Sequence, residues 1–345
     1  MSFIPWFGFV LLQFSLVFFI PKRLFIDISK RFVNFLQLIF YVETALLFIV
    51  VLMGVKAGVN QNIVDKSVLF FVYSLMPISL VYFFLLIIKD NNKINTVLFL
   101  APTILMASKS GMIFSLVLML SAKVLKREPI FTFKVSLSIL FVFLLYPVLI
   151  TIAIFKRTGG ESFLGFFTSL LSHMGGDFLS IYGFVLTSIS RRVSGIDVLM
   201  IPTVIDNFVF SLPSIFLYAL KGFFTAAFID TMLSMDSVGI GRLFAIEFLN
   251  QNKELANGFE PTFYGVVFHS LTPFVSSILL YCICLFPILF FRFQKNNIAS
   301  LMLCYFIFVY IFVFMSGTIV QLTQVFRFYI ILHLTYYVYI RVRFK

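Results

Sequence analysis

Two adjacent arginines give the strongest chemical signal in this chain. Arg191 and Arg192 follow an apolar stretch and precede a Ser-Gly turn and an acidic residue, Asp197. A guanidinium presents a rigid fork of donors that matches phosphate oxygens, and it keeps its charge in a partly dry site. The pattern is therefore typical of phosphate or pyrophosphate binding. The alternative is that one arginine binds lipid headgroups or pairs with Asp197.

Two further arginines belong to the same polar segment. Arg242 follows Gly241, and a glycine allows the backbone to approach a ligand closely. Glu247, five residues later, could act as a base or pair with Arg242, so a surface loop with a salt bridge is an equally good interpretation. Arg157 lies at the start of the segment.

Three more candidates lie in or beside apolar runs. Lys109 stands in Ser108–Gly111, at the centre of the apolar segment Thr96–Leu125. An ionisable side chain there is costly and marks a functional or cavity-lining position, unless it snorkels or meets a structural carbonyl. Arg327 lies near the outer end of the last apolar run. This position favours a role as an anchor at the membrane interface over a contact with a ligand. His269 is a candidate base, although a lone histidine is more often a hydrogen-bonded core residue.

Two other polar residues, Glu43 and His333, lie within apolar runs. Each predicts a polar contact between helices.

Several catalytic motifs are absent from the sequence. It has no Walker A loop, no Gly-x-Ser-x-Gly elbow, no His-Glu-x-x-His and no Asp-x-Asp pair. This favours chemistry without a metal or cofactor, on a substrate that carries its own leaving group.

The composition indicates which elements must position these residues. Of 345 residues, 61% are hydrophobic and 12% charged, and the mean hydropathy is +1.08. Soluble domains have roughly twice that charged fraction. We expect an all-α, polytopic integral membrane helix bundle, forming one domain over residues 1–345. The net charge of +12 comes largely from short connectors, which predicts contact with membrane lipids and no nucleic-acid partner.

Apolar runs of suitable length predict the spans. The segment Thr96–Leu125 is too long for one ordinary span, so we expect two short helices joined at Ser108–Gly111. Together with the polar segment, the bundle should hold about 9–11 transmembrane helices. The predicted single spans are Phe3–Ile20, Phe32–Val55, Val68–Ile88, Ser136–Phe155, Phe263–Phe291, Ile298–Met315 and Val325–Ile340.

Charge asymmetry predicts the orientation. With the connector Pro21–Arg31 placed inside, the inside connectors hold fifteen of the 26 basic residues and only three acidic residues. Segment 156–262, with nine of the fourteen acidic residues, then forms a large outer loop. Within it, Leu164–Ser188 and Leu199–Phe224 predict amphipathic interfacial helices, although one or both could span instead.

The chain resembles Wzy-type O-antigen polymerases of bacterial inner membranes. The resemblance rests on many Phe- and Leu-rich helices, the Ser108–Gly111 turn, an Arg-x-x-Gly element from Arg192 to Gly195, and Gly258–Gly265 leaving the loop. Relatives commonly have arginine in the early turn, where this chain has Lys109, which keeps the charge but not the bidentate fork.

The resemblance implies an enzyme that acts at the periplasmic face. It would transfer a growing glycan from undecaprenyl pyrophosphate onto a new lipid-linked repeat unit. The resemblance also implies a chain-length regulator protein as a partner. Cations would neutralise charge on the leaving pyrophosphate, and a base would take the acceptor hydroxyl proton. The pyrophosphate candidates are Arg191, Arg192, Arg242, Lys109, Arg157 and Arg327; the base candidates are Glu247, His269 and Asp197.

Two rival functions remain open. An O-antigen ligase performs the same class of chemistry with a different acceptor. A lipid-linked oligosaccharide flippase would favour charges spread through the membrane, whereas here they gather at one face.

Overall fold

The computed structural model describes part of the chain. The described residues are 11–13, 15–19, 28–52, 77–88, 93–105, 109–129, 132, 136–137, 140, 165, 168, 172, 180, 183, 212–224, 272–294, 296–316 and 319–343. Within them every regular element is a helix, so the all-α expectation is confirmed there. The chain divides into two compact units. One unit joins Met1–Asp27 to Ser190–Lys345, and the other is Ile28–Ile189.

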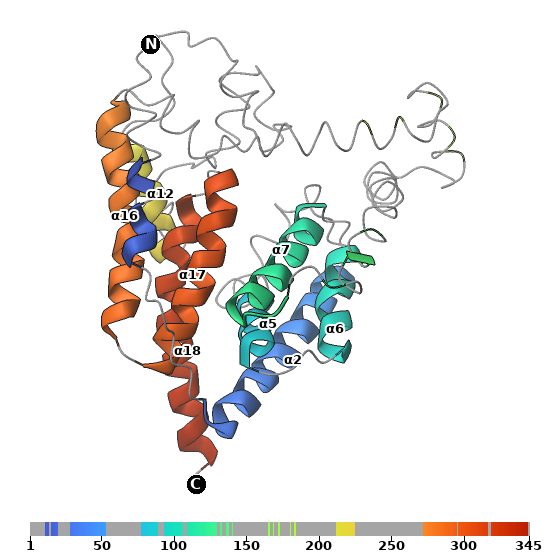
Figure 1. Ribbon diagram of the computed structural model, residues 1–345. Coiled ribbons are helices and arrows are strands. Elements are labelled where there is room, and N and C mark those ends of the chain that lie inside the picture. Colours follow the sequence, from blue (N-terminus) through green and yellow to red (C-terminus); the bar gives the residue numbers. More distant parts are fainter. Residues whose placement is uncertain are drawn as a thin grey trace. The chain divides into compact units, whose positions relative to one another are not determined.

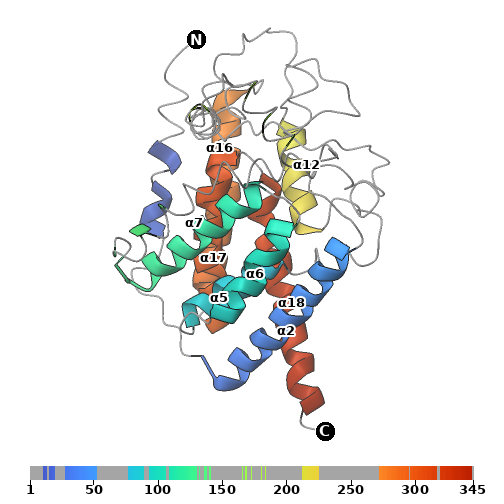
Figure 2. The ribbon, with the colours of Figure 1, turned by 90° about the vertical axis from the view of Figure 1, so that its right-hand side faces the viewer.

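The unit Ile28–Ile189 is built around four described helices, α2 (Lys30–Leu52), α5 (Ile78–Ile88), α6 (Lys93–Leu105) and α7 (Lys109–Leu125). Helix α5 packs against the other three, and α6 also contacts α2 and α7 (Figure 2). Aromatic rings fill the space between α2, α5 and α6. The ring of Tyr82 in α5 stacks on that of Phe99 in α6, with 4.2 Å between the ring centres, and its centre lies 5.9 Å from that of Phe40 in α2. The Tyr82 and Thr96 hydroxyls bond at 2.9 Å, which satisfies the polar groups of this apolar core.

The segment Thr96–Leu125 contains two helices, as predicted, but their junction differs from the prediction. Helix α6 ends at Leu105 and α7 begins at Lys109. Lys109–Gly111 therefore belong to the first helical turn of α7 and not to the connection between the two helices. With 13 and 17 residues, the helices are about 20 and 26 Å long. Both fall short of a hydrocarbon core about 30 Å thick.

The other unit contains η1 (Leu16–Phe19), α12 (Leu212–Phe223), α16 (Pro273–Phe293), α17 (Asn297–Ser316) and α18 (Ile319–Arg343). Helices α16, α17 and α18 pack against one another, and α12 lies against α18 and α16 (Figure 1). Each start has a local cause. Proline at the first position favours the start of α16, and Asn296 caps α17 through a 2.6 Å bond from the Ala299 N–H to its Oδ1.

The last helix is longer than the predicted span Val325–Ile340. It begins six residues earlier, at Ile319, and continues to Arg343. The first turns of α18 include the polar residues Gln321, Thr323 and Gln324, so the apolar run in the sequence begins only after them. They are nevertheless helical, because α12 packs along this part of the bundle.

The first apolar run is anchored on α16 and α17. The Ser15 hydroxyl donates to the Tyr281 hydroxyl at 3.0 Å, and the Tyr310 hydroxyl donates to Gln13 Oε1 at 2.7 Å. Helix η1 also packs on α16, where Arg292 donates to the Phe19 carbonyl at 3.3 Å. These contacts hold the described part of Phe3–Ile20 within the unit.

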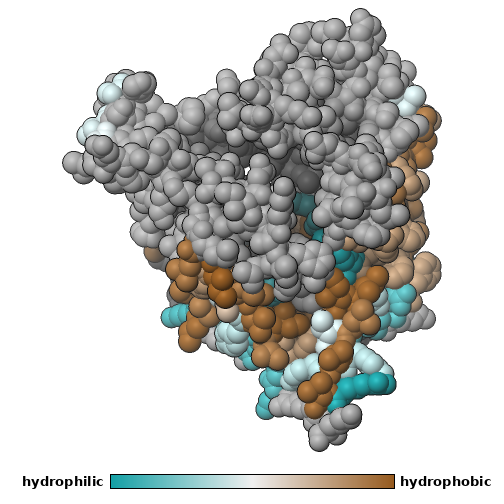
Figure 3. Space-filling model, turned by 180° about the vertical axis from the view of Figure 1, so that it is seen from behind, coloured by the Kyte–Doolittle hydropathy of each residue, from teal (hydrophilic) through white to brown (hydrophobic). Residues whose placement is uncertain are grey.

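Two described helices are long and apolar enough to cross a membrane by length and composition. They cover Lys30–Ile49 and Phe274–Phe293. Both also expose large apolar side chains, among them Leu52 of α2 and Phe274, Phe286 and Phe293 of α16. Apolar residues cover much of the described surface in Figure 3, which suits contact with lipid better than with water. The full span count, the single-domain arrangement and the outer loop stay predictions.

Candidate functional site

The structure describes two of the nine predicted site residues, Arg327 and Lys109. The other seven lie outside the described residues: Arg157, Arg191, Arg192, Asp197, Arg242, Glu247 and His269. The candidate site that can be built from described residues therefore centres on Arg327 of α18 and the end of α12.

Arg327 reaches the C-terminal end of α12. Its Nη1 donates to the Phe224 carbonyl at 3.4 Å, just beyond the last residue of that helix, and its Cζ lies 5.4 Å from the centre of the Phe328 ring. The last carbonyls of a helix lack intrahelical partners and carry partial negative charge. A cation placed there stabilises the helix end. The geometry thus gives Arg327 a structural contact with the end of α12, while its role as an anchor at the membrane interface stays a prediction.

A glycine brings α12 close to α18. Gly222 is buried, and a Cβ added to it would overlap the Val320 carbonyl and the Thr323 hydroxyl. The Thr323 hydroxyl donates across the interface to the Ala219 carbonyl at 2.6 Å. Small residues on one face of α12 therefore let its backbone reach α18, and the hydroxyl fixes the register between the two helices.

Lys221, in the last turn of α12, is a buried cation that sequence reasoning did not single out as a site residue. It is 3% exposed, although it stands in a helix that is otherwise largely apolar. The signal was present, because an ionisable residue within an apolar segment indicates a functional or structural site. Its place near a helix C-terminus also favours the positive charge.

Aromatic rings form the floor beneath this junction. Phe326, the residue before Arg327, is 5% exposed and contacts rings from both α12 and α16. The ring centres around it lie 5.2–6.1 Å away and belong to Phe223, Phe286, Phe290 and Phe291. Such packing is rigid and holds the backbone of α18 in place beside the end of α12.

Lys109 occupies the first position of α7. Helix α7 packs against α5 and α6 in the unit Ile28–Ile189. The structure thus assigns Lys109 to the start of a helix, which follows α6 in the chain.

Two candidate cations, Arg327 and Lys221, are thus supplied by α18 and by α12, a helix from the predicted loop. No family model, curated protein or solved structure matches the chain. Among the described residues, no three His, Cys, Asp or Glu side chains gather as metal ligands would. The expectation of chemistry without a metal stays a prediction.

Proposed function

We propose that this protein is a membrane glycosyltransferase that polymerises lipid-linked oligosaccharide repeat units. It would transfer the growing glycan from undecaprenyl pyrophosphate onto a new unit at the periplasmic face of the bacterial inner membrane. The proposal rests on the resemblance of the sequence and on the arginines of segment 156–262.

One structural observation supports it most directly. Segment 156–262, which carries Arg157, Arg191, Arg192 and Arg242, contributes α12, and α12 packs on α18 beside Arg327. Helix α12 holds this part of the segment on α18, as a loop that presents arginines to a membrane-bound substrate would require. The substrate carries its own leaving group, the lipid pyrophosphate. The protein would therefore need to position the two lipids, neutralise the developing charge and take up the proton of the acceptor hydroxyl.

The experiment that tests the function is the surface polysaccharide profile of a deletion strain. Extracted polysaccharide is separated on a silver-stained gel, with and without the gene on a plasmid. A pattern reduced to core plus a single repeat unit supports the polymerase. Complete loss of attached polysaccharide indicates a ligase or flippase instead, and an unchanged ladder contradicts any role in this polysaccharide.

The arginine mechanism needs a second experiment. Arg191, Arg192 and Arg242 are each replaced by Lys and by Ala, and the variants are expressed in the deletion strain. Bidentate recognition predicts shortened glycan chains with Lys as well as with Ala, because an ammonium lacks the planar fork. Full activity of all three Lys variants would show that charge alone suffices.

A further inference from the structure

The candidate span α2 carries a single acidic residue, and this residue is buried. Glu43 is 6% exposed, and its Oε2 has no hydrogen-bond partner among the described residues. It lies thirteen residues after Lys30, the first residue of α2, which is about 20 Å of helix. Both Lys30 and its neighbour Arg31 are exposed at that end. If that end marks a membrane interface, Glu43 lies within a hydrocarbon core about 30 Å thick.

The described helices that pack against α2 offer this carboxyl no buried cation. Helix α2 contacts α5 and α6. Their titratable side chains are Tyr82, on α5, and Lys93, the exposed first residue of α6. The other titratable groups of α2 itself, Lys30, Arg31 and Tyr41, are all exposed.

Three hydroxyls of these helices, those of Thr44, Tyr82 and Thr96, already have partners. The Thr44 hydroxyl donates to the Phe40 carbonyl at 2.7 Å, one turn earlier in α2. The Tyr82 hydroxyl is bonded to Thr96, and the rings of Phe40, Tyr82 and Phe99 fill the junction between the helices. Glu43 therefore lies on a helix that packs through apolar side chains, and the hydroxyls of Thr44, Tyr82 and Thr96 already have other partners.

An ionised carboxylate in such a place is unfavourable, because it loses water and gains neither a cation nor enough donors. The neutral acid avoids this loss of hydration. We propose that Glu43 is a proton-binding site: its carboxyl holds a proton at neutral pH within the α2–α5–α6 core and releases it only when water or a cation reaches the side chain. This inference is independent of the polymerase proposal, because it concerns one carboxyl and no substrate.

A lipophilic carbodiimide tests the protonation state directly. The acid proton moves to a carbodiimide nitrogen while the carboxyl oxygen bonds to the central carbon. An acyl shift from oxygen to nitrogen then gives a stable N-acylurea. Nothing leaves, so the peptide gains the mass of one whole reagent molecule. The reaction needs a protonated carboxyl and a reagent that enters apolar surroundings.

The purified full chain in detergent is treated with dicyclohexylcarbodiimide, and peptide mass spectrometry locates the adduct. Glu128 is the internal control, because it is exposed and lies 3.7 and 3.6 Å from Lys123 and Lys126. The expected result is an adduct on Glu43 several times more abundant than on Glu128 at neutral pH, falling as the pH is raised. A hydrophilic carbodiimide with glycine amide should show the reverse preference.

Two variants complete the test. The substitution E43Q should remove the adduct and keep the thermal midpoint of the native chain, because the amide has the size of the neutral acid. The substitution E128Q should leave labelling of Glu43 unchanged. Absence of a lipophilic adduct on Glu43, preferential labelling of Glu43 by the hydrophilic reagent, or a strongly lowered midpoint of E43Q would overturn the proposal.

Discussion

Gly222 and Thr323 meet where α12 lies against α18, at a spot that leaves no room for a side chain on the glycine. The Thr323 hydroxyl and the Val320 carbonyl occupy the place of the missing Cβ. The contact fixes a helix of segment 156–262 onto the last helix of the chain. It therefore determines how α12 is held, whatever substrate the protein uses.

A methyl group at this position should weaken the contact. We expect Gly222→Ala to lower the free energy of unfolding by about 1–3 kcal/mol, because backbone atoms must move to admit the Cβ. The thermal midpoint of the purified protein in detergent measures the effect. Gly183→Ala is the matched control, since a Cβ there meets nothing within 4 Å. Gly183 is helical, so alanine should be neutral or stabilising by up to about 1 kcal/mol. Equal midpoints for the two variants would contradict the close approach of α12 and α18.

The hydroxyl of Thr323 should contribute separately. Thr323→Val keeps the shape of the side chain but removes the 2.6 Å bond to the Ala219 carbonyl. The carbonyl then loses a partner across the helix interface, which should cost about 1 kcal/mol. Thr335→Val is the control, because its 2.8 Å bond to Ile331 lies within α18 on an exposed turn. A loss of stability of the same size in both variants would show that the bond between helices contributes nothing specific.

The sequence predicted helices well where one pattern dominated. Long apolar runs located α2, α17 and the end of α16 within a few residues, because burial and lipid contact both favour apolar side chains along a whole helix. The start of α16 lies at Pro273, ten residues after the predicted start of that span, Phe263. The predicted start of α18 was wrong, because Gln321 and Gln324 interrupt the run of apolar residues there. Hydropathy cannot show that a neighbouring helix, α12, packs along that part of the chain.

The site was harder to predict than the helices. Arg327 was expected first as an anchor at the membrane interface, which stays a prediction; its bond to the Phe224 carbonyl, a contact between helices, was not foreseen. Lys221 was missed, because charge alone does not tell which cation of a loop becomes buried. A contact such as Gly222 with Thr323 joins positions about a hundred residues apart, and no local pattern encodes it.

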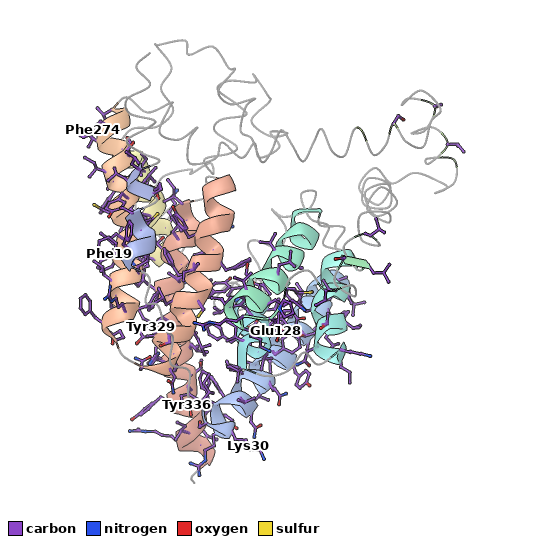
Figure 4. All side chains as sticks on the ribbon, in the orientation of Figure 1. Phe19, Lys30, Glu128, Phe274, Tyr329 and Tyr336 are labelled. Carbon is purple, nitrogen blue, oxygen red and sulfur yellow. The ribbon has the colours of Figure 1, made fainter. Side chains whose placement is uncertain are left out.

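Asn296 should stabilise the structure through both ends of its amide. Its Oδ1 caps α17, and its Nδ2 donates to the Tyr329 hydroxyl of α18 at 3.0 Å. Figure 4 shows Tyr329 among the packed side chains of this unit, where its ring centre lies 5.4 Å from that of Phe291. Asn296→Ala should cost about 1 kcal/mol for the cap and about 1 kcal/mol more for the lost bond to Tyr329.

A double-mutant cycle separates the two contributions of Asn296. Tyr329→Phe alone should cost about 1 kcal/mol, and it should cost little in a chain that already carries Asn296→Ala. Unfolding in denaturant, followed by circular dichroism, measures all four proteins. Strictly additive losses would show that the two side chains do not act together.

Arg127 ends α7 in a conformation that suits glycine better than arginine. Its φ is 59°, in the left-handed region. The Arg127 N–H bonds to the Val124 carbonyl and the Glu128 N–H to the Lys123 carbonyl, each at 3.0 Å, which is the Schellman pattern of a helix C-terminus. The left-handed conformation costs a residue with a Cβ about 1–2 kcal/mol, a cost that glycine avoids.

Arg127→Gly should therefore raise the free energy of unfolding by about 1 kcal/mol, part of the gain being lost to the greater freedom of glycine in the unfolded chain. Because Arg127 is exposed, the substitution removes little packing. Arg127→Ala is the matched control: it removes the same side chain but keeps the Cβ, so it should bring no gain. Both variants are compared with the native chain by thermal unfolding in detergent. If alanine stabilised as much as glycine, the effect would come from the lost charge, and the backbone argument would be wrong.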